Sequence, residues 1–269
     1  MIEFKWSKVD AKNSNTPILK DSDIDDLAEM LLQDYKPKLL HEPSKINYWH
    51  FLESYLGATV EVHDIYYEEK DGPIWGATAF NEEALRIFDR EHSRISHIRV
   101  GRGSIIMDNS VMEDGKEGLA LFTGLHEGGH WWLHPGVFTR NHKQLSLFGE
   151  ATTPSVVCCR RPQIENSCKK RSFKTGEEWR EHQANYFASA VAMPKATFIP
   201  FCQSYLKEAG ICEKRIVTGI DHRLDRIAFF DLPFRVTEVY GVSMQAATVK
   251  LKKFGLIADK KSLCQTTLL

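Results

Sequence analysis

The pentapeptide His-Glu-Gly-Gly-His at residues 126–130 constrains this chain more than any other feature. It lies in an apolar stretch over residues 116–134 that ends at a proline, which predicts a helix. Residues at i and i+4 lie one turn apart on the same helix face, so two imidazoles there can bind one tetrahedral cation. The spacing therefore predicts His126 and His130 as metal ligands and Glu127 as a general base directed toward a metal-bound water. Two ordinary histidines on an exposed helix face are the alternative.

The two glycines inside this pattern need a separate explanation. Each glycine costs about 1 kcal/mol relative to alanine in a helix, so fold stability alone does not account for Gly128 and Gly129. A bare backbone at these positions would let another helix or a substrate strand lie against the metal-binding face. We therefore expect a close approach of backbone at this point of the helix.

A catalytic zinc ion takes a third protein ligand and leaves its fourth position to water. His134 lies one further turn along the helix, but ligands at i, i+4 and i+8 of one straight helix cannot surround a single ion. We therefore interpret His134 as a residue at the helix end. The metzincin pattern is excluded as well, because it requires glycine and histidine where this chain has Leu133 and Gly136.

A better third ligand is Glu181, in a second predicted helix over residues 176–193 that ends before a proline. One stripe of this helix contains Glu181 together with small residues, namely Ala184, Asn185, Ala188 and Ala192. Such a stripe permits close packing against the first helix, which would place Glu181 at the metal and Asn185 beside a ligand imidazole. Glu177 and Glu178 are competing carboxylates, and a solvent-exposed acidic face is the alternative interpretation.

The remaining pattern predicts an α+β fold with a small antiparallel sheet packed against helices. Two amphipathic helices are expected within residues 20–57, and a sheet region is expected over residues 58–110. A short helix is expected over residues 81–91, among strands over 60–67, 74–80, 95–100 and 104–107. We expect residues 1–200 to form one domain and residues 201–269 to form a helical C-terminal extension.

The segment over residues 136–175 is poorly patterned and predicts a long loop or insertion, with a substrate-selecting flap as the alternative. It contains Cys158, Cys159 and Cys168, three of the six cysteines in the chain. Their spacing matches no common zinc site, so the pattern disfavours a second metal or redox centre. Six cysteines are also too few for a disulfide framework in a chain of 269 residues, and reduced thiols are expected.

Charge and hydropathy exclude some functional classes. The net charge is -1, so no field over the whole chain attracts nucleic acid or an acidic membrane. The N-terminal segment lacks the apolar region of a signal peptide, and no run approaches the roughly 18 apolar residues of a membrane span. These features predict a cytoplasmic protein without a membrane anchor.

The C-terminal region carries a weaker signal. Residues 234–256 contain a helix, a glycine turn, a serine cap and a second helix, a pattern typical of a helix-turn-helix. Lys250, Lys252 and Lys253 would then contact phosphates. A helical pair that packs on the rest of the chain, with its lysines toward water, is the favoured interpretation.

Taken together, the two motifs resemble those of the ImmA/IrrE family of metallo-endopeptidases. Members of that family show Phe-Thr before H-E-x-x-H, here Phe122-Thr123, and an apolar strand with Asp before it, here Ile105–Asp108. They then show E-x-x-A-N-x-F-A, here Glu181 to Ala188, and end in Met193-Pro194. The resemblance covers about residues 20–200, and the segment between the motifs is longer than in shorter members.

This resemblance implies a zincin-like, and more closely a gluzincin-like, fold with H-E-x-x-H on a central helix. It implies a zinc-dependent endopeptidase with His126, His130 and Glu181 as zinc ligands and Glu127 as the catalytic base. Family substrates are often helix-turn-helix repressors of mobile elements or stress-response genes, so a transcriptional repressor is the expected partner. The ligand set favours Zn²⁺, with manganese as the alternative.

Two other functions remain open. One is a zinc-containing sensor or binding module that sequesters a partner, and the other is a DNA-binding regulator that uses the C-terminal helices. In the peptidase mechanism, zinc lowers the pKa of its water and Glu127 takes the proton. His134, His142 and Tyr186 are candidates for stabilising the oxyanion.

Overall fold

The computed structural model describes residues 2, 6–10, 12, 15–138, 156–160, 173 and 175–260, with the backbone alone for residues 71 and 158–160. Among the described residues, no helix combines the length and the apolar character needed to cross a bilayer.

The fold is α+β, as the sequence predicts. The strands are β1 (Val9–Asp10), β2 (Thr16–Pro17), β3 (Thr59–His63), β4 (Ile74–Ala79), β5 (Glu83–Asp89), β6 (Arg94–Val100), β7 (Ser104–Asp108), β8 (Val156–Arg160), β9 (Ile216–Thr218) and β10 (Ile257–Asp259). The longer helices are α1 (Asp21–Tyr35), α3 (Glu117–Leu133), α6 (Gly176–Ala192), α7 (Lys195–Glu208), α9 (Leu232–Tyr240) and α10 (Met244–Lys253). Shorter helices and turns are η2 (Pro37–Leu40), α2 (Tyr48–His50), η3 (Phe51–Tyr55), η4 (Glu69–Asp71), η5 (Asn109–Val111), α4 (Pro135–Phe138), α8 (His222–Arg226) and η6 (Ile227–Asp231).

The main sheet has the strand order β3-β7-β4-β8 and is mixed rather than antiparallel. β3 runs parallel to β7, whereas β4 runs antiparallel to both β7 and β8. The predicted antiparallel sheet is therefore wrong in one pair. Alternation of apolar residues predicts that a strand exists, but strand direction depends on the connections. Here β4 and the β5–β6 hairpin lie between β3 and β7 in the chain. After them β7 can pair with β3 in the same direction.

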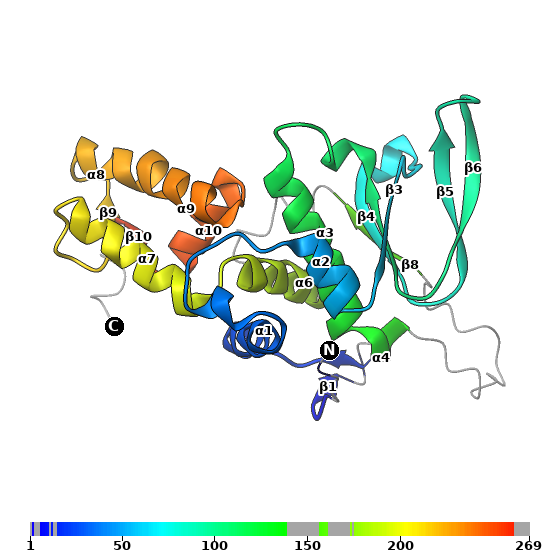
Figure 1. Ribbon diagram of the computed structural model, residues 1–269, viewed down its shortest axis with the longest axis horizontal. Helices are drawn as coiled ribbons and strands as arrows, with labels where there is room; N and C mark the ends of the chain where they lie inside the picture. Colours follow the sequence, from blue (N-terminus) through cyan, green and yellow to red (C-terminus); the bar gives the residue numbers. More distant parts are fainter. Residues whose placement is uncertain are drawn as a thin grey trace.

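The helix predicted over residues 81–91 is wrong, because this segment forms β5. β5 pairs with β6 in an unbroken antiparallel register from Glu83↔Val100 to Asp89↔Arg94. The apolar residues of β5 also fit helical spacing, so periodicity alone did not decide between the two structures. Apolar cross-strand pairs, such as Leu85 with Ile98, favour the hairpin. In Figure 1 the hairpin lies at one end of the molecule, beside the main sheet.

Helices α3 and α6 pack against each other in the middle of the molecule, between the sheet and the C-terminal helices (Figure 1). Both lie where the sequence predicts helices. Thr175 caps α6 by accepting a hydrogen bond from the backbone N–H of Glu178. Pro135 begins the short helix α4 directly after His134 closes α3, which suits the missing N–H of proline.

The second of the two helices predicted within residues 20–57 begins at Tyr48. Asn47 caps α2, and the chain continues through a π-helical turn, η3, to Tyr55. Gly57 then adopts a φ of 66°, a left-handed conformation that ends the helical segment. Leu52 of η3 is fully buried and packs on α3.

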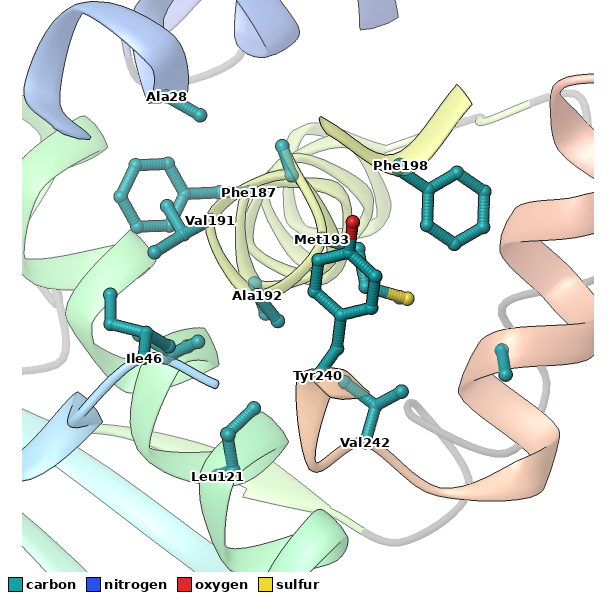
Figure 2. Packing of buried hydrophobic residues seen from close by; sticks show 14 of the residues in the cluster. Ala28, Ile46, Leu121, Phe187, Val191, Ala192, Met193, Phe198, Tyr240 and Val242 are labelled. Atoms are coloured by element: carbon teal, nitrogen blue, oxygen red, sulfur yellow. The ribbon is translucent and has the colours of Figure 1, made fainter. Parts of the chain in front are cut away.

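The C-terminal helices share one continuous core with α6. Figure 2 shows Tyr240 and Val242 beside Met193 and Phe198, next to the end of α6. The Tyr240 hydroxyl also donates a hydrogen bond of 3.2 Å to Thr197 Oγ1. α7 runs through residue 200, and the domain boundary expected there stays a prediction.

Within this region α9 and α10 form the helix pair that the sequence indicates. Gly241, with a φ of 68°, ends α9, and the Ser243 side chain caps α10. The expectation that Lys250 reaches phosphate or water is wrong, because its side chain is only 2% exposed and lies against Asp25 of α1. Lys253 contacts Asp21 of the same helix. Tertiary packing, which the sequence pattern does not reveal, decides which way these lysines face.

Candidate metal centre

The three predicted metal ligands meet where α3 packs on α6. The Nε2 atoms of His126 and His130 lie 3.0 Å apart. Glu181 Oε1 lies 3.3 Å from His130 Nε2, and Glu181 Oε2 lies 3.5 Å from His126 Nε2. All three side chains are buried, and their candidate ligand atoms lie within 4.8 Å of one another. Three donors from two helices therefore converge on one point.

The two glycines of the pentapeptide allow α3 to pack closely against two neighbouring segments, α6 and η3. A Cβ atom on Gly129 would lie 3.0 Å from Phe187 Cδ1 and 3.3 Å from Ala184 Cα, both in α6. A Cβ atom on Gly128 would lie 2.5 Å from Leu52 Cδ2. The predicted close approach is therefore made by two neighbouring helical segments, and the small residue at 184 completes the contact with α6.

Burial sets the protonation of the two imidazoles. Desolvation by burial, with a further contribution from His130, lowers the pKa of His126 to about 4. Desolvation, with a further contribution from Arg180, lowers the pKa of His130 to about 3. Both rings are therefore neutral near pH 7, and each has one nitrogen lone pair available to a metal.

Asn185 orients the first imidazole, as its position one turn after Glu181 predicts. Its Oδ1 lies 3.0 Å from His126 Nδ1. A carbonyl oxygen only accepts hydrogen bonds, so Nδ1 carries the proton and Nε2 presents its lone pair to the cluster. A second partner of this kind is the usual support for a metal-binding histidine.

The carboxylate of Glu181 indicates that this cluster suits a bound cation. Burial raises the pKa of Glu181, although His126 and Arg180 act in the opposite direction. Glu181 Oε2 is buried without a hydrogen-bond partner. An unpartnered buried carboxylate oxygen is unfavourable, and a cation between the three side chains would supply the missing interaction. Two imidazoles and one carboxylate form a donor set that suits zinc.

Glu127 follows His126 on α3 and packs against strand β4. The hydroxyl of Thr78 donates a hydrogen bond of 2.5 Å to Glu127 Oε2, whereas Oε1 is buried and has no partner. Burial raises the pKa of Glu127 well above its ordinary value, and the charge of Glu181 acts in the same direction. Thr78 was missed by the sequence reasoning, because only the packing of β4 on α3 brings it here.

Several other candidates lie away from the cluster. Glu177 and Glu178 are exposed, which leaves Glu181 as the carboxylate at this site. Tyr186 donates its hydroxyl to Asp25 Oδ2 at 2.8 Å, so it is not available to an oxyanion. His142 lies outside the described residues, as do Cys168 and the side chains of Cys158 and Cys159.

His134 is also not placed to stabilise an oxyanion, because it lies behind His130. Its Nδ1 lies 3.0 Å from His130 Nδ1, and its Nε2 lies 2.9 Å from Gln183 Oε1. Its interpretation as a residue at the helix end holds, since it closes α3. The sequence reasoning missed Gln183, which no local motif indicates.

Comparison with known proteins gives one family. Residues 157–252 match the M78 peptidase family, which is described as an IrrE N-terminal-like domain. This match supports membership of the ImmA/IrrE family. The matched region includes α6 with Glu181 and extends through most of α10, whereas the pentapeptide at 126–130 precedes it. The match supports a peptidase, that is, a hydrolase of peptide bonds that acts on a protein substrate. No curated protein matches the chain.

Proposed function

We propose that this chain is a zinc-dependent intracellular endopeptidase with a zincin-like catalytic domain. In this proposal His126, His130 and Glu181 bind zinc, and Glu127 is the general base. The observation that carries it is the meeting of two neutral imidazoles and a buried carboxylate, 3.0 to 3.5 Å apart, next to Glu127, whose Oε1 is buried without a hydrogen-bond partner. Such an arrangement is unfavourable without a cation and suits a hydrolytic metal site.

The residues around the cluster have distinct roles in this mechanism. Bound zinc would supply a Lewis acid that lowers the pKa of a water molecule and polarises the peptide carbonyl. Glu127 takes a proton at Oε1, while the Thr78 hydroxyl holds Oε2 in place. The same carboxyl group then delivers the proton to the departing amine. Asn185 keeps His126 in the tautomer whose Nε2 faces the cluster.

The proposed substrate is a specific protein, such as a helix-turn-helix transcriptional repressor in the cytoplasm. The support is the resemblance of both motifs to the ImmA/IrrE family and the match over residues 157–252. A DNA-binding role for the C-terminal helices is less well supported, because Lys250 and Lys253 contact Asp25 and Asp21 within the molecule. A sensor that only sequesters a partner would not need Glu127 held by Thr78.

The purified protein is expected to hold about one zinc ion per chain, bound by the three clustered residues. Saturation with zinc at about 1,000 times its dissociation constant should raise the free energy of unfolding by roughly 4 kcal/mol. His126→Ala and Glu181→Gln should each lose this zinc-dependent increase. Glu178 is an exposed residue of α6, the helix that carries Glu181. Glu178→Gln is therefore the matched control and should behave like the native protein.

Zinc content after gel filtration and chemical unfolding with and without zinc measure these effects. If His126→Ala and Glu181→Gln bind zinc as tightly as the native protein, the proposed ligand set is wrong.

Gly76→Ala is expected to disturb Glu127 without removing it. A Cβ atom at residue 76 would lie 2.7 Å from Glu127 Oε1 and 2.9 Å from its Cγ, so the carboxyl group must move. Displacement of a catalytic group by about 1 Å can lower a rate by roughly a hundredfold, and we expect a loss of up to that size in kcat with zinc content unchanged. Gly101→Ala is the control, because open space surrounds that position. Equal activity of the two variants would argue against the assigned position of the base.

A further inference from the structure

His134 is a fully buried histidine that the proposed ligand set does not use. It closes α3 one turn after His130, and its two ring nitrogens have different partners. Nδ1 lies 3.0 Å from His130 Nδ1, and Nε2 lies 2.9 Å from Gln183 Oε1. Two imidazoles that face each other through the same kind of nitrogen can form a hydrogen bond only if one of them donates and the other accepts.

A contact with the N-terminal segment determines which of His130 and His134 donates. The amide nitrogen of Gln183 donates a hydrogen bond of 2.7 Å to the carbonyl oxygen of Pro17 in β2. A carbonyl oxygen cannot donate, so the NH₂ group of Gln183 must face Pro17 and its Oε1 must face His134. Oε1 in turn only accepts, so the proton of His134 lies on Nε2.

The remaining steps follow from the number of protons available. His134 is fully buried and its two hydrogen-bond partners are an imidazole and an amide, so nothing beside it favours a second proton and its ring carries one. With that proton on Nε2, His134 Nδ1 is an acceptor and His130 Nδ1 must be the donor. An imidazole that binds a metal carries one proton, so with that proton on Nδ1 the Nε2 of His130, 3.0 Å from His126 Nε2 and 3.3 Å from Glu181 Oε1, is left with a lone pair.

We propose that Gln183 is a positioning residue for the metal centre: anchored on Pro17, it fixes through His134 the tautomer of His130 that can bind a metal. This inference rests on the proposed metal centre and adds to it a residue for which no motif exists. It also gives the two histidines different supports, since Asn185 acts directly on His126 whereas Gln183 acts on His130 through a second ring.

The N-terminal strand is therefore part of the site, although it contributes no ligand. β2 is held by pairing with β1 and by Arg180 of α6, which donates a hydrogen bond of 2.8 Å to Thr16 Oγ1. Thr16 and Gln183 are both buried, so the anchor lies inside the molecule.

Gln183→Leu tests the relay, because leucine has a similar size and provides neither donor nor acceptor. His134 can then place its proton on Nδ1 and donate to His130, which moves the proton of His130 to Nε2. We expect zinc affinity, measured by competition with a chromophoric chelator near pH 7.5, to fall by about 10- to 100-fold. Gln183→Glu keeps an acceptor toward His134 and should recover most of the affinity. Tyr240→Phe, which loses a buried hydrogen bond between α9 and α7, is the control for stability and should bind zinc like the native protein.

A second measurement needs no enzymatic activity. Long-range ¹H–¹⁵N spectra of the native zinc-free protein report which ring nitrogen carries the proton. The relay predicts Nδ1–H for His130 and Nε2–H for His134, and a change to Nε2–H for His130 in Gln183→Leu. An Nε2–H signal for His130 in the native protein, or native zinc affinity in Gln183→Leu, would overturn the proposal. Failure of the native protein to bind zinc would instead refute the proposed metal centre, while the spectra would still test the relay.

Discussion

Glu127→Gln is expected to lower kcat/KM for peptide hydrolysis by about 10²- to 10⁴-fold while zinc remains bound. Glutamine has nearly the same shape, and its carbonyl oxygen can still accept the hydrogen bond from Thr78. An amide nitrogen then replaces the second carboxylate oxygen, Oε1, which is the atom without a partner. An amide cannot take a proton from water at neutral pH, so the loss should appear in kcat rather than in substrate binding.

The measurement compares kcat and KM for native protein, Glu127→Gln and Glu178→Gln on one cleaved peptide or protein. Glu178 is an exposed glutamate on α6, so its replacement controls for the loss of a negative charge near the cluster. Native zinc content in Glu127→Gln would separate the loss of the base from loss of the metal. Retention of more than a tenth of the native kcat would exclude Glu127 as the base.

Lys250→Met is expected to lower the free energy of unfolding by about 3–5 kcal/mol, the usual effect of removing one partner from a buried ion pair. Lys250 Nζ lies 3.7 Å from Asp25 Oδ1 and 3.4 Å from the carbonyl oxygen of Ser189. Asp25 is itself 5% exposed, and its other oxygen accepts from Tyr186. Without the lysine, a buried carboxylate on α1 would lose its cation, and α10 would lose its polar contact with α1 and α6.

The pH dependence of this effect has a definite sign. Burial lowers the pKa of Lys250 from 10.5 to about 8, although Asp25 acts in the opposite direction. Between about pH 8 and 10.5 the unfolded chain binds more protons at this residue than the folded chain does. The contribution of Lys250 to stability therefore rises with pH across that window, and Lys250→Met should lack this rise.

Urea unfolding at several pH values between 7 and 10 tests both statements. Lys252→Met is the matched control, because Lys252 is an exposed lysine on the same helix. Asp25→Asn combined with Lys250→Met should recover part of the loss, since no buried charge is then left alone. A change in Lys250→Met as small as that in Lys252→Met would show that the pair does not join the C-terminal helices to the core.

The part of the candidate site that depends on helical spacing can be predicted from the sequence. Helical spacing places His126 and His130 on one face, and the small-residue stripe of α6 brings Glu181 and Asn185 to them. Each of these predictions uses a pattern that lies within a few turns of one helix. The short pattern of apolar and small residues is sufficient to predict them.

The residues that the sequence reasoning missed all depend on long-range packing. Thr78 reaches Glu127 only because β4 lies against α3, and Gln183 reaches Pro17 across 166 positions of the chain. Strand direction in the sheet and the inward orientation of Lys250 also depend on contacts between distant parts of the chain. The helix predicted over residues 81–91 was wrong for a different reason, because the apolar spacing of β5 fits both a helix and a strand.

The most direct test of the central claim compares newly created protein N-termini in cells that express either the native chain or Glu127→Gln. The two proteins should bind zinc equally, so any difference reports the base and not the fold. A zinc endopeptidase with a specific substrate predicts a small set of new N-termini, from one or a few proteins, that appear only with the native chain. Indistinguishable sets of N-termini under several stresses, with zinc bound in both proteins, would contradict the cleavage mechanism and leave a zinc-containing binding protein.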